Sequence, residues 1–379
     1  MRTLKNTLAA LALTLAATPL AAQSDILLQL RSGSPAGDRF RVDSAGGMVA
    51  LGTIGIGIIP ASGAGWRMMW HPQKVAFRAG YADAGGQFDE SNIGYYSWAG
   101  GALNIGAGIY SFAMGNQNTV EFGSTGGIAL GGSNKIWAVN GGAYGIALGY
   151  QNDVLDDYGA AIGQNNWSDG IAAIAMGFNS TADENYSMAL GYRASTNGQL
   201  GSIVIATGNP ALTTDSLEAI APNEFVVRAS GGIRLRSNVS LSNGCSIAAS
   251  GTSWVCSSSR TLKENFQPVD GEELLRRIRG VELNRWTLID DPARTPHIGP
   301  FAEDFHAAFG VGDDPRAIGH QDIDGVNFGG VQALDARTLQ MQETIAGQAR
   351  QIEQLQADKA AMEARIQRLE ALLTPPSAP

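Results

Sequence analysis

A five-residue unit, small-x-Ala-aliphatic-Gly, recurs six times between residues 111 and 191. The copies occupy residues 111–115, 127–131, 145–149, 159–163, 173–177 and 187–191, and polar turns separate them. Their closing glycines are 16, 18, 14, 14 and 14 residues apart. A short period of this kind is typical of solenoids, in which each repeat can bury its apolar face only against its neighbours. Because alanine and glycine leave little interior space, the repeat predicts a narrow β-roll.

The unit is similar to the S-x-A-x-G head repeats of trimeric autotransporter adhesins, and the resemblance covers about residues 111–208. It implies a parallel β-roll and a homotrimer that acts as an adhesin-like protein. An adhesin contacts a receptor, for which extracellular matrix and carbohydrate are the candidate classes.

The N-terminus predicts export. Arg2 and Lys5 precede an apolar run at residues 8–17, and residues 19–22 offer a cleavage site of the secretory type. The apolar run is well short of the ~20 residues that a membrane-spanning helix needs. We therefore expect a signal peptide at 1–22, no membrane span after its removal, and a secreted or cell-surface protein.

Residues 23–110 are predicted to form a glycine-rich β region. Residues 26–31 and 39–43 approximate the alternating pattern of strands, and a glycine turn lies at 44–47. Aromatic residues gather between Trp66 and Tyr96. They could form a ligand patch, but we favour the interpretation that they fill a thin core, since aromatic side chains dominate core burial.

Composition divides the chain at residue 258. Residues 23–257 contain 27 charged side chains and 39 of the 49 glycines, whereas residues 258–379 contain 32 charged side chains in about half the length. Both parts are mildly acidic, and neither has the basic stripe that nucleic-acid binding requires. The sequence therefore predicts two structural regions and no nucleic-acid partner.

The two cysteines, Cys245 and Cys256, lie in a region of residues 209–257 that we expect to form a β neck. In an exported protein, an even number of cysteines predicts a disulfide first. We favour an intrachain bridge across a hairpin, and free thiols or an interchain bond are the alternatives. The four histidines are scattered and none is paired with a cysteine, so the sequence predicts no metal site and no cofactor.

A candidate nucleophile and a candidate base lie where the two regions meet. Ser258 has a hydroxyl, which is a weak nucleophile until a neighbouring base takes its proton. Lys263 can serve as that base when burial favours its neutral amine, and Ser–Lys pairs are known to replace the Ser-His-Asp triad. The spacing alone is a weak signal, because a serine-rich linker before a lysine has the same pattern.

The surrounding sequence strengthens the catalytic interpretation. Residues 258–265, SSRTLKEN, are similar to the S-[DS]-R-x-x-K-E-N opening of the endosialidase-type intramolecular chaperone family. Its members form the C-termini of phage tail spikes, tail fibres and some bacterial surface proteins. Further resemblances follow in the family's order: a helix and turn at 274–281, a strand at 283–286, an I-G-x-x-A-E-[ED] motif within 297–305, and a lead into a long helix at 326–328.

The resemblance implies a chaperone domain at 258–340 that cleaves the chain between Ser257 and Ser258. Ser258 would be the nucleophile and Lys263 the general base. The chain departs from many relatives at Ser259, where they carry aspartate.

Residues 331–373 predict a coiled coil, and residues 374–379 form a short tail. One heptad register places these residues alternately at a and d: Val331, Leu334, Thr338, Met341, Ile345, Gln348, Ile352, Leu355, Lys359, Met362, Ile366, Leu369 and Leu373. Isoleucine at a with leucine at d favours dimers, but three polar side chains interrupt the seam. The heptads leave the oligomeric state open, and the resemblance to adhesins implies a trimer.

These features predict a mainly β N-terminal part, a small α/β chaperone domain and a C-terminal coiled coil. The favoured function is an exported trimeric adhesin or fibre whose chaperone releases itself in a single-turnover Ser–Lys reaction, so that no multiple-turnover enzyme is expected.

One alternative is an uncleaved fibre whose C-terminal domain remains as a permanent trimer clasp. Another is a polysaccharide-degrading enzyme of the tail-spike type, which needs clustered carboxylates. The candidate carboxylates for it are Asp153, Asp156, Asp157, Asp183 and Glu184.

Overall fold

The computed structural model describes residues 26–32, 37–137, 143–208 and 215–373. The chain divides into two compact units, residues 1–257 and 258–379, and the boundary falls at the Ser257–Ser258 bond. The predicted signal peptide and the tail at 374–379 lie outside the described residues.

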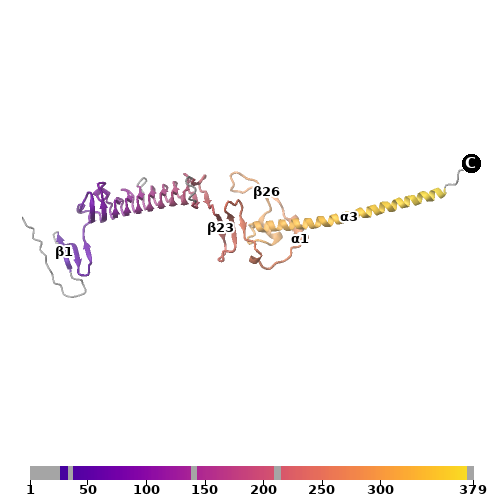
Figure 1. Ribbon diagram of the computed structural model, residues 1–379, viewed down its shortest axis with the longest axis horizontal. Helices are drawn as coiled ribbons and strands as arrows, with labels where there is room; N and C mark the ends of the chain where they lie inside the picture. Colours follow the sequence, from indigo (N-terminus) through magenta and orange to yellow (C-terminus); the bar gives the residue numbers. More distant parts are fainter. Residues whose placement is uncertain (1–25, 33–36, 138–142, 209–214, 374–379) are drawn as a thin grey trace, which may run out of the picture. The chain divides into compact units, whose positions relative to one another are not determined.

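The N-terminal unit is built around a β-solenoid whose coils stack side by side (Figure 1). Its larger sheet has eleven strands among the described residues, in this spatial order: β22 (Phe225–Arg228), β20 (Ile203–Ala206), β18 (Met188–Tyr192), β16 (Ile174–Phe178), β14 (Ala160–Gln164), β12 (Ile146–Tyr150), β10 (Ile128–Gly132), β8 (Phe112–Asn116), β6 (Trp98–Ala102), β5 (Ala76–Ala82) and β4 (Gly65–His71). The second sheet has eight short strands: β21 (Leu217–Glu218), β19 (Ala194–Ser195), β17 (Thr181–Ala182), β15 (Trp167–Ser168), β13 (Asp153–Val154), β11 (Lys135–Ile136), β9 (Thr119–Val120) and β7 (Ile105–Gly106).

The repeat sets the register between neighbouring coils. Each repeat alanine pairs with the next one in a parallel ladder, as Ala129 does with Ala147. The six repeat alanines are completely buried, because alternate residues of a strand point to opposite faces and alanine takes the inner one. The predicted β-solenoid is therefore confirmed. Two further strands, β6 and β20, extend it with imperfect copies of the unit. Gly100 stands in place of the aliphatic residue in β6, and Val204 and Ala206 stand in place of the alanine and the closing glycine in β20.

The closing glycine of the repeat is required by the backbone. Gly149 has a φ of 118°, a region that side-chain-bearing residues rarely adopt. A Cβ atom on Gly149 would lie 2.0 Å from the carbonyl oxygen of Gly163 in the next coil. Glycine therefore allows the coils to approach closely enough to pair.

A ladder of asparagines runs through the solenoid interior. In five successive coils, its members follow the closing glycine by three positions and are at most 1% exposed: Asn104, Asn118, Asn134, Asn152 and Asn166. In the middle of the ladder, Asn152 Nδ2 lies 3.0 Å from Leu148 O, 2.9 Å from Asn134 Oδ1 and 2.8 Å from Gly163 O. These amides satisfy buried carbonyl groups where the chain turns, which an alanine interior could not do.

The N-terminal end of this unit departs from one expectation. A small antiparallel sheet of β1 (Ile26–Ser32), β2 (Gly37–Asp43) and β3 (Met48–Ala50) precedes the β4–β5 hairpin, and a short 3₁₀ helix, η1 (Glu90–Asn92), follows that hairpin. The interpretation that the aromatics between residues 66 and 96 fill a core holds only in part: Phe88 is fully buried, but Trp66 is 82% exposed and Tyr96 is 44% exposed. The interior is narrow and takes mainly alanine, asparagine and branched aliphatic side chains, so the rings of Trp66, Tyr95 and Tyr96 remain exposed.

A three-stranded antiparallel sheet ends the N-terminal unit. It consists of β23 (Gly232–Arg236), β24 (Gly244–Ala248) and β25 (Val255–Cys256). Cys245 and Cys256 are register partners on β24 and β25.

The C-terminal unit is small and increasingly helical. It contains the 3₁₀ helix η2 (Arg260–Leu262), α1 (Gly271–Gly280), a hairpin of β26 (Asn284–Trp286) and β27 (His297–Gly299), α2 (Ala302–Phe309) and α3 (His320–Leu373). Helix α1 packs on α3, where Gly329 and Gly330 leave room for Leu274 and Ile278. Helix α3 begins at His320, so residues 326–328 already lie inside the helix that they were expected to precede. In the described parts of the chain, no helix is both long and apolar enough to cross a membrane.

Candidate active site

The two candidate catalytic side chains meet within one short segment of the C-terminal unit. Lys263 Nζ donates a hydrogen bond of 2.7 Å to Ser258 Oγ. Both side chains are exposed in the single chain. A hydroxyl in direct contact with an amine is the arrangement in which a base can take the proton of a nucleophile.

A single 3₁₀ turn brings these side chains together. Ser259 is the N-cap of η2, and its hydroxyl accepts a hydrogen bond from the backbone N–H of Thr261 at 3.3 Å. The turn closes through Leu262 N–H to Ser259 O at 3.0 Å and Lys263 N–H to Arg260 O at 3.2 Å. Serine is a favourable N-cap, so Ser259 supports the turn between Ser258 and Lys263.

Arg260 contacts an aromatic ring next to this turn. Its guanidinium carbon lies 5.2 Å from the centre of the Phe266 ring, a cation–π distance. Arg260 therefore supports the segment that follows η2.

Ser257, which precedes the candidate cleavage bond, is hydrogen-bonded to the sheet formed by β23, β24 and β25. Ser257 N–H donates to Gly244 O at 2.9 Å, which continues the β24–β25 ladder beyond Cys256. Ser257 Oγ lies 2.9 Å from Ser242 O and 3.0 Å from Gly244 O, so its proton can be donated to either carbonyl. One residue earlier, the sulfur atoms of Cys245 and Cys256 are bonded at 1.99 Å. Sequence reasoning did not single out the Ser257 hydroxyl, because its partners lie 13 and 15 residues away in the chain.

The carboxylates proposed for a polysaccharide-degrading site have structural contacts in the solenoid turns. Asp157 accepts the backbone N–H of Ala143 at 2.6 Å. Asp183 accepts the hydroxyl of Thr196 at 2.6 Å and the backbone N–H of Gly198 at 3.0 Å. Burial raises the pKa of Asp153, although the indole of Trp137 and the ammonium of Lys135 oppose the shift. The hydrogen bonds of Asp157 and Asp183 stabilise turns of the solenoid.

A neighbouring carboxylate, Asp169, was not singled out from the sequence. Burial raises its pKa, and the negative charges of Asp156, Asp183 and Glu184 raise it further, while a hydrogen bond from Trp167 acts in the opposite direction. The 14-residue spacing that aligns these turns on consecutive coils is the signal that could have revealed the group.

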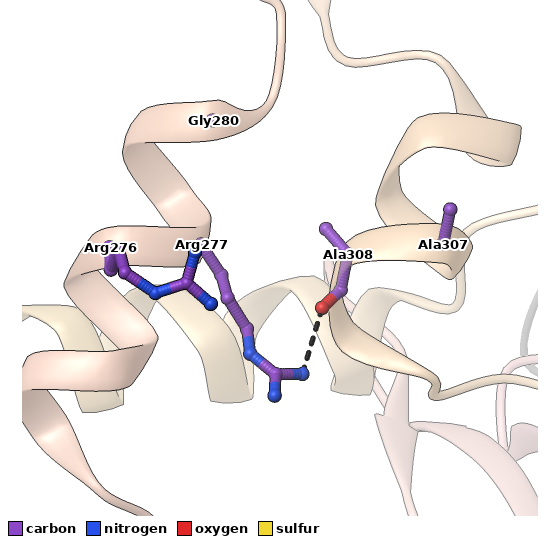
Figure 2. A pocket seen from close by; sticks show the side chains of 5 residues that line it. All are labelled: Arg276, Arg277, Gly280, Ala307 and Ala308. Atoms are coloured by element: carbon purple, nitrogen blue, oxygen red, sulfur yellow. Dashed lines mark hydrogen bonds between the residues drawn. The ribbon is translucent and has the colours of Figure 1, made fainter.

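A shallow hollow lies between α1 and α2 (Figure 2), lined by Arg276, Arg277, Gly280, Ala307 and Ala308. Arg277 Nη1 donates to Ala308 O at 2.9 Å and thereby ties the two helices together. Hydrogen bonds from Arg276 and Arg277 lower the pKa of Glu273 to about 2. The arginines of this hollow are therefore occupied by an acidic neighbour and by the backbone, and the lining offers no nucleophile.

No group of three or more histidine, cysteine or acidic side chains in the described residues is arranged to hold a metal ion. The hydrogen-bonded pair of Ser258 and Lys263 needs neither a metal nor a cofactor for its chemistry.

Two segments of the chain match known family models. Residues 258–311 match the family described as the chaperone of endosialidase. Residues 168–194 match two copies of the YadA head domain repeat. The first match begins at Ser258, and the second lies within the solenoid. The predicted arrangement of head-like repeats followed by an endosialidase-type chaperone is therefore confirmed. No curated protein and no solved structure matches the chain significantly.

Proposed function

We propose that the protein is an exported homotrimeric adhesin or fibre whose C-terminal unit aligns three chains and then releases itself by cleavage between Ser257 and Ser258. The observation that carries the proposal is the 2.7 Å contact between Lys263 Nζ and Ser258 Oγ, which lies at the start of the segment that matches the endosialidase chaperone.

The pair can perform the cleavage with no external catalyst. Lys263 in its neutral form takes the proton of Ser258 Oγ, and the oxygen attacks the carbonyl carbon of Ser257. The C–N bond breaks, the proton passes to the departing amine of Ser258, and an ester joins the Ser257 carbonyl to the Ser258 oxygen. Water then hydrolyses the ester, which leaves a carboxylate on Ser257 and restores the Ser258 hydroxyl beside a new N-terminal amine.

The outer face of the larger solenoid sheet supports self-association. The two outward positions of each repeat strand are apolar and incompletely buried in the single chain: Phe112 and Met114, Ile128 and Leu130, Ile146 and Leu148, Ala160 and Ile162, Ile174 and Met176, and Met188 and Leu190. The outward positions of the second sheet are mostly polar, as Thr119, Lys135, Asp153 and Thr181 show. A continuous apolar face marks an interaction surface, and two further copies of this chain are the occupants that the resemblance to trimeric adhesins implies.

Helix α3 carries a second self-association surface. Its heptad positions present exposed apolar side chains, including Ile345, Ile352, Leu355 and Ile366, each more than half exposed in the single chain. Burial of this stripe against equivalent helices would bring three chains into register at their C-terminal ends.

Assembly also explains when the cleavage takes place. Lys263 is exposed in the single chain, and a lysine side chain acts as a base only in its neutral form. Burial disfavours the charged form, so a trimer that covers this segment would favour the neutral amine that the reaction needs. Removal of the chaperone then makes the product kinetically stable, because unfolded chains no longer carry the unit that aligned them.

Mass analysis of the purified protein tests the self-cleavage. Wild type is expected to give two fragments that meet at the Ser257–Ser258 bond, whereas Ser258→Ala and Lys263→Ala remain intact. Lys263→Arg is the sharper variant, because it keeps the positive charge but the guanidinium cannot act as a base at accessible pH. Cleavage of Lys263→Arg at the wild-type rate would exclude Lys263 as the base, and an intact wild-type chain in native trimers would instead indicate a permanent clasp.

A further inference from the structure

We infer that the hydroxyl of Ser257, together with the Cys245–Cys256 bridge, is a positioning device for the scissile carbonyl group. The inference rests on the proposed self-cleavage and extends it to the residues that hold the bond to be cut. All of its contacts lie within the N-terminal unit, and only the peptide bond itself continues to Ser258.

The strand that delivers the scissile carbonyl has very little pairing of its own. Strand β25 contains only Val255 and Cys256, and its ladder with β24 consists of two residue pairs. Both of its residues are exposed. A strand end of this length frays readily, since exposed chain ends open with little free-energy cost.

Two features on either side of the strand end compensate for this short ladder. The bridge between Cys256 and Cys245 joins the strand covalently to its neighbour one residue before Ser257. The Ser257 side chain then reaches Ser242 O at 2.9 Å and Gly244 O at 3.0 Å, while its N–H donates to Gly244 O at 2.9 Å. Backbone, side chain and disulfide thus restrain the chain immediately before the carbonyl that Ser258 attacks.

Restraint of this carbonyl matters for the rate of the reaction. Intramolecular attack is fast only when the reacting atoms are held in a near-attack geometry, and a displacement of about 1 Å can cost about 100-fold in rate. A side chain other than serine or threonine at position 257 lacks the hydroxyl that contacts the Ser242 and Gly244 carbonyls. Loss of the hydroxyl or of the bridge is therefore expected to slow cleavage without removing the Ser258–Lys263 pair.

The test follows cleavage of pulse-labelled full-length chains made by cell-free translation in a disulfide-forming redox buffer. Conversion into two fragments is quantified by denaturing gel electrophoresis, and the trimer fraction is measured in parallel on native gels. We expect the first-order cleavage rate per trimer to fall about 10-fold or more in Ser257→Ala and in the double variant Cys245→Ala/Cys256→Ala. Ser257→Thr, which keeps a hydroxyl, should restore most of the wild-type rate. Ser253→Ala, an exposed serine in the β24–β25 hairpin, is the matched control and should cleave as wild type does.

Each outcome decides between two explanations. Wild-type rates in Ser257→Ala and in the double cysteine variant would overturn the positioning role while leaving the proposed self-cleavage intact. The role would also be overturned if Ser257→Thr were as slow as Ser257→Ala, or if slower cleavage merely followed a loss of trimers. Absence of cleavage in wild type, equal to Ser258→Ala, would overturn the proposed function and this inference together.

Discussion

The side-chain amide of Asn152 contacts carbonyl oxygens of its own coil and of both neighbouring coils. Its own oxygen accepts the backbone N–H of Asn166 at 3.1 Å and the Asn166 side chain at 2.9 Å. At the residue scale, the solenoid is thus joined by a continuous chain of amides as well as by its strand ladders. Such a network is stabilising only while every buried member keeps a partner.

Replacement of one asparagine of the ladder should destabilise the solenoid. Asn152→Ala leaves the carbonyls of Leu148 and Gly163 without this donor, and an unsatisfied buried polar group costs about 1–3 kcal/mol. We expect the variant to unfold at a clearly lower denaturant concentration than wild type, measured by chemical denaturation of the released N-terminal product under identical conditions. Asn116→Ala, at an exposed position of β8, is the control and should stay close to wild type. Equal stability of the two variants would show that the ladder contributes little.

Asp169 gives the solenoid a small dependence on pH. Burial and then nearby negative charges raise its pKa in the folded chain, so the folded state binds a proton more readily than the unfolded state. Ionisation of Asp169 therefore destabilises the fold above this raised pKa, and the cost disappears as the pH falls below it. Asp169→Asn keeps an acceptor for the Trp167 indole and removes the charge, so it should raise the melting temperature at pH 7. The rise should be only on the order of 1–2 °C, because Asp169 is only partly buried and solvent screens its charge.

The same two proteins compared at about pH 3.5, below the usual aspartate pKa, provide the control. The difference in melting temperature should vanish there, since wild-type Asp169 is then protonated in the folded state. A gain that persists at low pH would point to a cause other than charge.

At the element scale, helix α3 combines a packed and an unpacked portion. Near its start it packs on α1, and Arg337 pairs with Glu272 of α1, which lowers the pKa of that carboxyl. Farther along, the apolar heptad positions are exposed in the single chain. The helix thus connects a folded unit to a surface that other chains can cover.

A single charge placed among the apolar heptad positions of α3 should prevent trimer assembly while the single chain still folds. Ile352→Asp places a carboxylate at a predicted a position, where a trimer would bury three like charges without partners. We expect at least a several-fold loss of trimer, measured by size-exclusion chromatography with light scattering. Ala357→Asp adds the same charge at an exposed position outside the stripe and should assemble normally. Normal trimers from Ile352→Asp would show that α3 does not form the predicted coiled coil.

At the scale of the whole molecule, the solenoid is expected to fold and assemble slowly. Its parallel pairings join residues 14 to 23 positions apart, and its outer face is apolar in the single chain. Non-local strand pairing slows folding, and exposed apolar surface invites aggregation. A detachable C-terminal unit that brings chains together addresses both problems.

Whether a chain carried residues 258–379 during folding should therefore decide whether it forms a trimer. A chain that ends at Ser257 by an introduced stop codon has the same sequence as the released product but never carried residues 258–379. We expect the released product to be a trimer that does not reform after complete unfolding, and the truncated chain to give mostly aggregate or monomer. Light scattering before and after a cycle of denaturant unfolding and refolding makes the comparison. Efficient refolding of the product would show that the chaperone is not needed for assembly.

The sequence alone determined the features that depend on short spacings. The repeat of alanine and glycine predicted the β-solenoid, because an inward alanine and a positive-φ glycine occur once in each of the six repeat coils. The change in composition at residue 258 falls where the chain divides into two compact units. Ser258 and Lys263 could be singled out because only one short turn separates them, and the two cysteines because they are the only pair available.

Only the tertiary structure decided what depends on contacts between coils. Asn166 belongs to a segment that reads as a polar turn, yet it is buried in the ladder. Arg78 is buried as well, where burial lowers its pKa to about 10 and its guanidinium donates to Ser97 O and Gly106 O. Trp66, which composition assigned to a core, lies outside. The physical reason is common to all three: the direction of a side chain is set by the coil stacked against it, and that neighbour lies too far along the chain for a local pattern to reveal.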